Sequence, residues 1–145
     1  MADEPNALSV ERRLELAAEL SEVRRLNDWL RVIAEEHGWS DQLANDIKLC
    51  LNEAVANILD HSFAQGADGW TQVTITEEDK AVRVVLRDDG FRFDPLSLPI
   101  PETPTDIADA QIGGLGVKLI RQTASDVYYR HDGTHNVLAM RFDKP

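Results

Sequence analysis

The sequence has little of several features that mark large protein classes. It contains one cysteine, Cys50, so no intrachain disulfide can form. A lone thiol between two leucines indicates a packed side chain, and it is compatible with a reducing compartment. No run approaches the ~18 consecutive apolar residues of a membrane span, and the acidic, polar start does not resemble a signal peptide. We therefore expect a cytoplasmic protein with no membrane segment.

Basic residues are also scarce. The chain of 145 residues has 15 Lys and Arg against 26 Asp and Glu, a formal net charge of −11. Neutralising nucleic-acid phosphates requires clustered Lys and Arg, whereas Arg12-Arg13 and Arg24-Arg25 lie among glutamates. We therefore expect no direct nucleic-acid binding. The 43% of hydrophobic residues is enough for one compact domain with a real core.

The first half of the chain predicts one strand and two helices in a single domain over residues 1–145, with residues 1–7 as a flexible N-terminus. Apolar residues alternate from Leu8 to Leu16, as on one face of a strand. They then recur every three or four residues in two segments, which predicts amphipathic helices that end near Gly38 and before Gly66.

The second half predicts two antiparallel hairpins, separated by a long loop and a helix. The predicted strands are residues 71–76, 81–86, 127–130 and 136–142, the loop is 88–112 and the helix is 115–123. Four of the six prolines lie in this loop, and a loop that long in a compact domain is usually functional. The order of elements predicts an α+β fold, a two-layer α/β sandwich in which helices cover one face of a mostly antiparallel sheet.

Three short segments carry residues with chemical potential. In the first, Glu53, Asn57 and His61 are spaced by four along the second predicted helix, so they project from the same side, opposite much of the apolar set. A glutamate can accept a proton from a hydroxyl, and a carboxamide oxygen can bind a hard cation such as Mg²⁺. Taken alone, the stripe also fits a solvated helix face. A His-rich zinc site is excluded, because His61 has no Cys or His partner at ligand spacing.

The second segment, Asp88-Asp89-Gly90, ends a predicted strand. A carboxylate at a strand end can accept a hydrogen bond from an exocyclic amine such as that of adenine. A glycine beside it lets the backbone turn or approach a ligand closely. Taken alone, an ordinary Asp-Gly turn is the simpler interpretation.

The third segment, Gly113-Gly114-Leu115-Gly116, directly precedes a predicted helix. Glycines at a helix N-terminus expose backbone N–H groups where the helix dipole is positive, which favours an anion. A flexible hinge explains the glycines equally well. No Gly-Lys-Ser/Thr follows, so this is not a Walker loop. A Pro-rich loop precedes it instead of a strand, so it is not a dinucleotide fingerprint.

In this order, the three segments resemble the ATPase domain shared by histidine kinases, DNA gyrase, Hsp90 and MutL, the GHKL superfamily with the Bergerat fold. The matching motifs are Glu53…Asn57, Asp88…Gly90 and Gly114…Gly116. Residues 51–61, 88–95 and 112–121 are similar to a narrower family, the anti-sigma factor serine/threonine-protein kinases of bacterial partner-switching systems. This resemblance spans about residues 8–142.

The resemblance implies a role for each matched residue. Glu53 would be the general base that activates a serine hydroxyl, and Asn57 would bind the Mg²⁺ that bridges the phosphates. Asp88 would accept a hydrogen bond from the adenine amino group, with Gly90 giving the base room. The residues expected to contact the phosphates are Gly113, Gly114, Leu115, Gly116 and Lys118.

Two features depart from the family pattern. Relatives commonly carry basic residues just before the Gly-Gly turn, whereas residues 103–112 contain no Lys or Arg. Neutralising a phosphoryl group in transfer would then depend on Lys118, Arg121 or Arg92. Relatives also often have a Thr in the final strand near the adenine, and we expect Ala139 to take that place here.

The resemblance implies an anti-sigma factor that binds ATP and Mg²⁺ and phosphorylates a serine of an anti-sigma antagonist of the STAS type. The other implied partners are a sigma factor, a serine phosphatase that reverses the modification, and a second copy of the chain, since many relatives form homodimers. The main alternative is a regulatory module in which ATP switches a partner interface without phosphate transfer. A third interpretation is the catalytic half of a split histidine kinase. It is less favoured, because the sequence shows no helical dimerisation segment that bears a phospho-accepting His.

Overall fold

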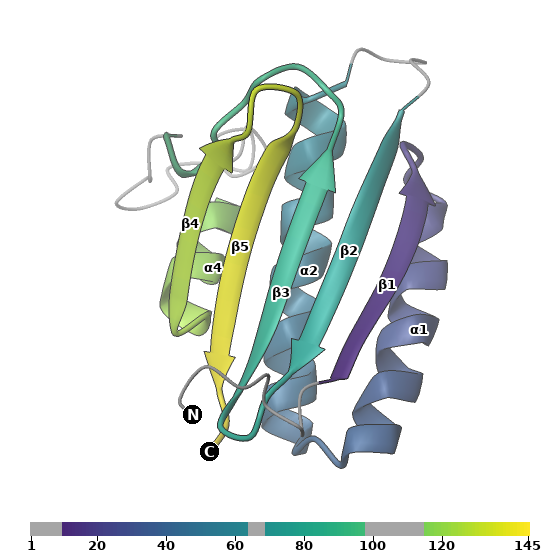
Figure 1. Cartoon of the computed structure of the whole chain (residues 1–145), viewed down its shortest axis with the longest axis vertical. Coiled ribbons are helices and arrows are strands. Elements are labelled where there is room, and N and C mark those ends of the chain that lie inside the picture. The colour runs from purple at the N-terminus through teal and green to yellow at the C-terminus, as the bar shows by residue number, and fades with distance from the viewer. Residues whose placement is uncertain (1–9, 64–68, 98–114) are drawn as a thin grey trace, which may run out of the picture.

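The computed structural model describes residues 10–63, 69–97 and 115–145. Figure 1 shows their arrangement. The elements are β1 (Val10–Ala17), α1 (Glu22–His37), α2 (Asp41–His61), β2 (Trp70–Glu77), β3 (Ala81–Asp88), a 3₁₀ turn η1 (Pro95–Ser97), α4 (Leu115–Thr123), β4 (Asp126–His131) and β5 (Asn136–Asp143).

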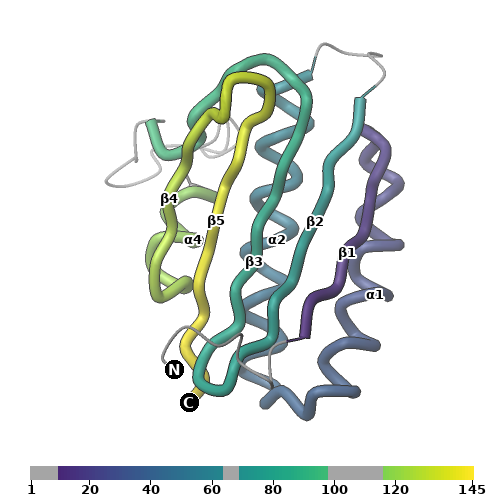
Figure 2. The backbone as a smooth tube through the Cα atoms, in the orientation of Figure 1, coloured from purple at the N-terminus to yellow at the C-terminus, as the bar shows by residue number. Residues whose placement is uncertain are grey.

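The strands form one five-stranded antiparallel sheet in the order β1-β2-β3-β5-β4. The α-helices of the described residues lie behind this sheet, with α1 beside β1, α2 behind the centre and α4 behind β4 and β5 (Figure 1). The backbone trace shows how β5 lies between β3 and β4, so that the last strand of the chain is not at the edge of the sheet (Figure 2). This architecture confirms the predicted α+β two-layer sandwich.

Local sequence explains where the two long helices end and begin. Gly38 follows α1 in the left-handed conformation, with φ of 63°, which glycine adopts without a Cβ penalty. Ser40 precedes α2 with an extended backbone, and its Oγ accepts a hydrogen bond from the backbone N of Leu43 at 3.1 Å. This bond satisfies one of the N–H groups that the first turn of a helix leaves unpaired.

The core lies between the sheet and the helices. It takes alternate residues of the strands and the inward faces of α1 and α2. Cys50 is fully buried in it, and this burial raises the pKa of its thiol to about 12. The thiol is therefore un-ionised at neutral pH, as the prediction of a packed cysteine requires.

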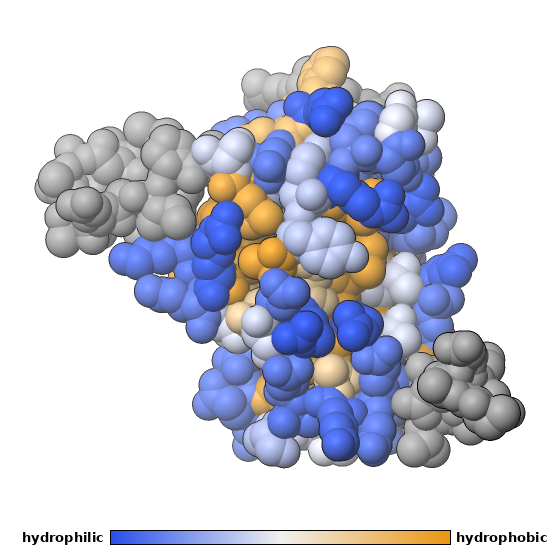
Figure 3. Space-filling view, turned by 60° about the vertical axis from the view of Figure 1, so that its left-hand side comes forward, coloured by the Kyte–Doolittle hydropathy of each residue, from blue (hydrophilic) through white to orange (hydrophobic). Residues whose placement is uncertain are grey.

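The other face of the sheet carries no helix or strand within the described ranges (Figures 1 and 2). A view with the β4 side brought forward shows hydrophobic patches broken up by hydrophilic residues (Figure 3). Tyr128, from β4, is among the exposed side chains. None of the helices that the structure describes is both long and apolar enough to cross a membrane.

Candidate functional site

Asp88 lies at the end of β3 and is buried, with 2% of its surface exposed. Its Oδ1 accepts hydrogen bonds from the backbone N of Gly90 and from Nδ2 of Asn136, both at 3.0 Å. Burial raises the pKa of the Asp88 carboxyl above its usual range, and these two hydrogen bonds oppose that shift. A buried carboxylate with a perturbed pKa is a frequent feature of functional sites.

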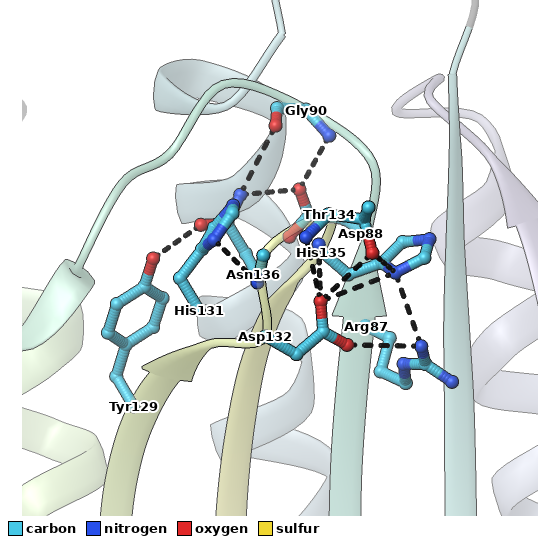
Figure 4. A network of polar contacts seen from close by, with 10 residues as sticks. Arg87, Asp88, Gly90, Tyr129, His131, Asp132, Thr134, His135 and Asn136 are labelled. Atoms are coloured by element: carbon cyan, nitrogen blue, oxygen red, sulfur yellow. Dashed lines mark hydrogen bonds and ion pairs between the residues drawn. The ribbon is translucent and has the colours of Figure 1, made fainter.

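Asn136 begins β5 and links Asp88 to the chain that follows it (Figure 4). Its Nδ2 also donates to the carbonyl oxygen of Phe91 at 2.8 Å. Its Oδ1 accepts from the backbone N of Phe93 at 3.0 Å and from the Tyr129 hydroxyl at 2.5 Å. One side chain thus holds the end of β3, the Gly90–Phe93 turn and β4 together.

Sequence reasoning missed Asn136. The available signal was its position. Asn136 lies two and four residues before the buried Leu138 and Met140 in β5, so all three share one face of the strand, and Asn136 is a polar residue on the core side. Such a residue must find hydrogen-bond partners inside the protein. Which partners it finds depends on the pairing of β5 with β3, where Asn136 stands directly opposite Asp88.

The role expected for Ala139 is wrong. Ala139 pairs with Val85, and it lies three positions after Asn136 along β5. Because side chains alternate between the two faces of a strand, Ala139 lies on the sheet face away from the helices. The final-strand residue beside Asp88 is Asn136.

Gly90 allows the turn after β3 to pack against the end of α2. A Cβ at this position would lie 2.3 Å from the backbone oxygen of Ser62. The same oxygen accepts a hydrogen bond from the backbone N of Phe91 at 2.6 Å. The glycine is therefore required by contact between two backbones, and its expected role in giving a base room stays a prediction.

Asn57 is buried on α2 and lines the same small hollow as Asp88, Asn136 and Tyr129. Its Nδ2 has no hydrogen-bond partner among the residues that the structure describes. Two expectations for Asn57 are wrong. It does not lie on a polar stripe opposite the apolar residues of the helix, and it does not lie on a solvated face. The reason is tertiary: the ends of the strands and the turn after β3 close over this side of α2.

Glu53 lies one turn before Asn57 and faces the beginning of α4. A Cβ on Gly116 would lie 2.5 Å from Oε2 of Glu53, so glycine permits this close approach. The first and third sequence segments therefore meet, as the family resemblance implies. Gly113 and Gly114, and the side chain of Leu115, lie outside the described residues.

His61, the last member of the stripe, stacks on Phe93 with ring centroids 4.6 Å apart. The three residues spaced by four therefore meet three different parts of the chain: Glu53 meets α4, Asn57 faces the Asp88 hollow, and His61 meets the turn after β3. All three lie on one uninterrupted helix, and the helix period predicts a shared direction for them.

The basic side chains expected to neutralise the phosphate differ in their surroundings. Arg121 donates from Nη2 to the carbonyl oxygen of Leu96 at 3.4 Å, which ties α4 to η1. Arg92 is exposed, and Lys118 is partly buried on α4, two residues after Gly116. Their predicted contacts with phosphate stay predictions.

Comparison with known proteins agrees with this geometry. Residues 16–142 match the family model of the histidine kinase-like ATPase domain. The chain therefore belongs to the histidine kinase-like ATPase family.

Curated relatives narrow the resemblance. The chain is 30% identical over 118 residues to the serine/threonine-protein kinase BtrW of Bordetella bronchiseptica, covering 81% of this chain and 83% of the relative. It is 28% identical over 114 residues to the serine-protein kinase RsbW of Listeria monocytogenes, covering 76% and 73%. Identity to RsbW of Bacillus cereus is 27% over 137 residues, covering 92% and 84%. The resemblance to the anti-sigma factor kinase family, drawn from the motifs, is confirmed.

A solved structure supports the fold. The crystal structure of the RsbU and RsbW domains of Rv1364c from Mycobacterium tuberculosis superposes with a TM-score of 0.62 at 17% identity, covering 94% of this chain. This chain spans 33% of that longer protein, and at this identity the likeness concerns the fold alone.

Proposed function

We propose that this chain is an ATP-dependent protein-serine/threonine kinase that acts as an anti-sigma factor in a bacterial partner-switching system. The observation that carries the proposal is the convergence of the three segments. Asp88 and Asn57 line one hollow, and Glu53 meets Gly116 one helical turn away. Relatives named as serine and serine/threonine kinases support the reaction class.

The proposed substrate is a serine of a STAS-type anti-sigma antagonist. The other proposed partners are a sigma factor, a serine phosphatase that restores the antagonist, and a second copy of the chain. These proposals rest on the family resemblance, and they place the protein in the bacterial cytoplasm as a regulator of transcription.

The residues present fit a nucleotide at this site. Both hydrogen bonds to Asp88 reach Oδ1, and none of the described residues donates to Oδ2, so this oxygen can accept an amino group. The backbone N–H groups in the first turn of α4 have no partner within the helix, and the positive end of its dipole favours phosphate.

The residues also fit Mg²⁺. The Asn57 carboxamide is buried with one atom unpaired in the described structure, and its oxygen and nitrogen can exchange places by a rotation about the side chain. Mg²⁺ usually binds one or two protein oxygens together with substrate phosphates, so Asn57 would be its protein ligand. When bound, the ion neutralises charge on the phosphates.

Each proposed role belongs to a named group of the chain. The Asp88 carboxylate orients the base, and the segment Gly113–Gly116 holds phosphate oxygens with its backbone N–H groups. Glu53 accepts the proton from the serine hydroxyl, whose oxygen then acts as the nucleophile. The charge of the transferred group is balanced by Lys118, Arg121 or Arg92.

Phosphorylation of the cognate antagonist tests the proposal. The chain is incubated with Mg-ATP and the antagonist, and phosphoserine is measured by mass spectrometry. Glu53→Gln is expected to slow transfer by roughly 10²–10⁴-fold, the usual contribution of a general base, while ATP binding persists. Asp60→Asn, an exposed change on the same helix, is the control and keeps full activity. Transfer at the wild-type rate in Glu53→Gln contradicts the assigned base.

The second candidate function is an ATP-regulated binding module without phosphate transfer. It is favoured by the lack of Lys or Arg in residues 103–112 and by the contact of Arg121 with the Leu96 carbonyl. Tight ATP binding without phosphoserine on any antagonist selects this function over the kinase.

A further inference from the structure

The Asn136 side chain uses all of its hydrogen-bonding capacity. Its Nδ2 donates to Asp88 Oδ1 at 3.0 Å and to the Phe91 carbonyl at 2.8 Å. Its Oδ1 accepts from Phe93 N and from the Tyr129 hydroxyl. A carboxamide has two N–H donors and two acceptor lone pairs, so the set is complete. Because the backbone N of Phe93 can only donate, the contacts also fix which end of the amide is oxygen.

This arrangement restricts Asp88 to one orientation. The donors at Asn136 and at Gly90 both reach Oδ1, and the carboxylate lies 2% exposed. Rotation that brought Oδ2 to the same donors would require the loss of both bonds at once. The second oxygen is thereby directed away from the Gly90–Phe93 turn.

We propose that Asn136 is the positioning residue of the base site, holding Oδ1 of Asp88 so that Oδ2 accepts the exocyclic amine of a 6-aminopurine and disfavours a 6-oxopurine. This inference rests on the proposed binding of ATP. A 6-oxopurine places a carbonyl oxygen opposite the carboxylate, where two acceptors face each other. The preference therefore depends on Asp88 being both ionised and held in place.

The electrostatics of Asp88 agree with this role. Burial is the largest influence on its pKa and raises it, whereas the amide of Asn136 is the largest influence that lowers it. Without this donor, Asp88 is protonated more readily, and a protonated carboxyl can donate to a 6-oxo group. Asp89 and His135 also act on Asp88, in opposite directions, and both stay unchanged in the variants below.

The experiment compares the binding of ATP and inosine triphosphate, which has a 6-oxo group in place of the amine, by calorimetry with Mg²⁺. Asn136→Val removes the donor. Asn136→Thr introduces a side chain of the same shape as valine, but its hydroxyl can donate a hydrogen bond across the strand pair to Asp88. We expect the preference for ATP to fall about tenfold in Asn136→Val, the value of one hydrogen bond to a charged group. In Asn136→Thr it stays within about threefold of wild type by the same reasoning.

Tyr128→Phe is the control, because Tyr128 is the residue next to Tyr129 in β4, is exposed, and lines a different hollow from Asp88 and Asn136. Its preference for ATP is expected to match that of wild type. An equal loss of affinity for both nucleotides in Asn136→Val, with the ratio unchanged, overturns the inference and makes Asn136 a folding residue only. If Asn136→Val does not fold, Asn136→Leu replaces it, since it also removes the N–H donors and branches at the same carbon as asparagine, and the same ratio decides.

The wild-type measurement separates this inference from the proposed function. A chain that binds neither nucleotide contradicts the proposed function itself. A chain that binds both equally well keeps its ATP binding and contradicts only the positioning role of Asn136.

Discussion

The two ends of the site differ in how fully their polar groups are paired. At the base end, Asp88, Asn136 and Tyr129 are joined to each other and to the Gly90–Phe93 turn by hydrogen bonds of 2.5–3.0 Å. At the phosphate end, Asn57 keeps a buried amide nitrogen without a partner in the described structure. The base end is organised by the chain alone, whereas the phosphate end has polar capacity left for a ligand.

This difference predicts how each end responds to mutation. A paired network contributes to folding, because removing one member leaves others buried without partners. An unpaired buried group costs stability until a ligand binds it. Changes at the base end should therefore affect stability and base selectivity, and changes at the phosphate end should affect affinity or rate with little loss of stability.

Among the changes that compare the two ends, the largest effect is expected from Asn57→Ala. Loss of a contact to a charged ligand costs about 1.5–3 kcal/mol, so Mg-ATP should bind roughly 10–100-fold more weakly. The free energy of unfolding should change by less than about 1 kcal/mol, because the removed amide is an unpaired buried group. Calorimetry and urea denaturation measure the two quantities. A large loss of stability with unchanged affinity would make Asn57 part of the fold rather than of the site.

Gly90→Ala tests the packing of the base end. The added methyl group would lie 2.3 Å from the Ser62 backbone oxygen, and neither backbone can move without breaking the hydrogen bond between Phe91 and Ser62. We expect the free energy of unfolding to fall by about 1–3 kcal/mol, measured by urea denaturation without nucleotide. Unchanged stability would show that the turn can separate from α2 at little cost.

Gly116→Ala is the matched change at the phosphate end. Its methyl group would lie 2.5 Å from Oε2 of Glu53, the tip of a flexible side chain that can move aside. We expect transfer to slow by roughly tenfold, because small displacements of catalytic groups reduce rates. Stability should hold or rise by up to about 1 kcal/mol, since alanine favours a helix over glycine. Full kinase activity in this variant would contradict the need for close approach at Glu53.

The smallest expected effect is that of Asp88→Asn on the free energy of unfolding, and this effect depends on pH. Burial raises the pKa of Asp88 in the folded state, so the folded protein binds the proton more tightly than the unfolded chain. The carboxyl therefore contributes stability below its unfolded pKa of about 3.9 and loses this contribution as pH rises through the folded value. Asparagine does not titrate, so the free energy of unfolding of the variant should rise relative to that of wild type as pH rises above about 4. Urea denaturation at several pH values checks this; a difference that is constant with pH contradicts the raised pKa.

Much of the fold was predictable because its signals are local. Alternation in residues 8–16 and helical spacing up to Gly38 specify β1 and α1, and the predicted helix over residues 115–123 matches α4. The order of the three motifs was also sufficient to identify the family. Each of these features depends on neighbouring residues or on motif spacing, which a single sequence displays directly.

The parts that sequence reasoning missed depend on contacts between distant segments. Asn136 and Asp88 are 48 residues apart and meet because β5 pairs with β3 in one register. A shift of that register by one residue would turn Asn136 to the other face of the sheet. Asn57 resembles a surface residue until the strand ends and the turn after β3 pack over α2.

The sequence by itself therefore determined the elements, the family and the identity of Glu53, Asn57, Asp88 and Gly116 as site candidates. Only the tertiary structure decided that Asn57 is buried, that Gly90 is required by the backbone of Ser62, and that Asn136 holds Asp88. The physical reason is that periodicity reports which side of an element a residue occupies, whereas burial and hydrogen-bond partners are set by the element that packs against that side.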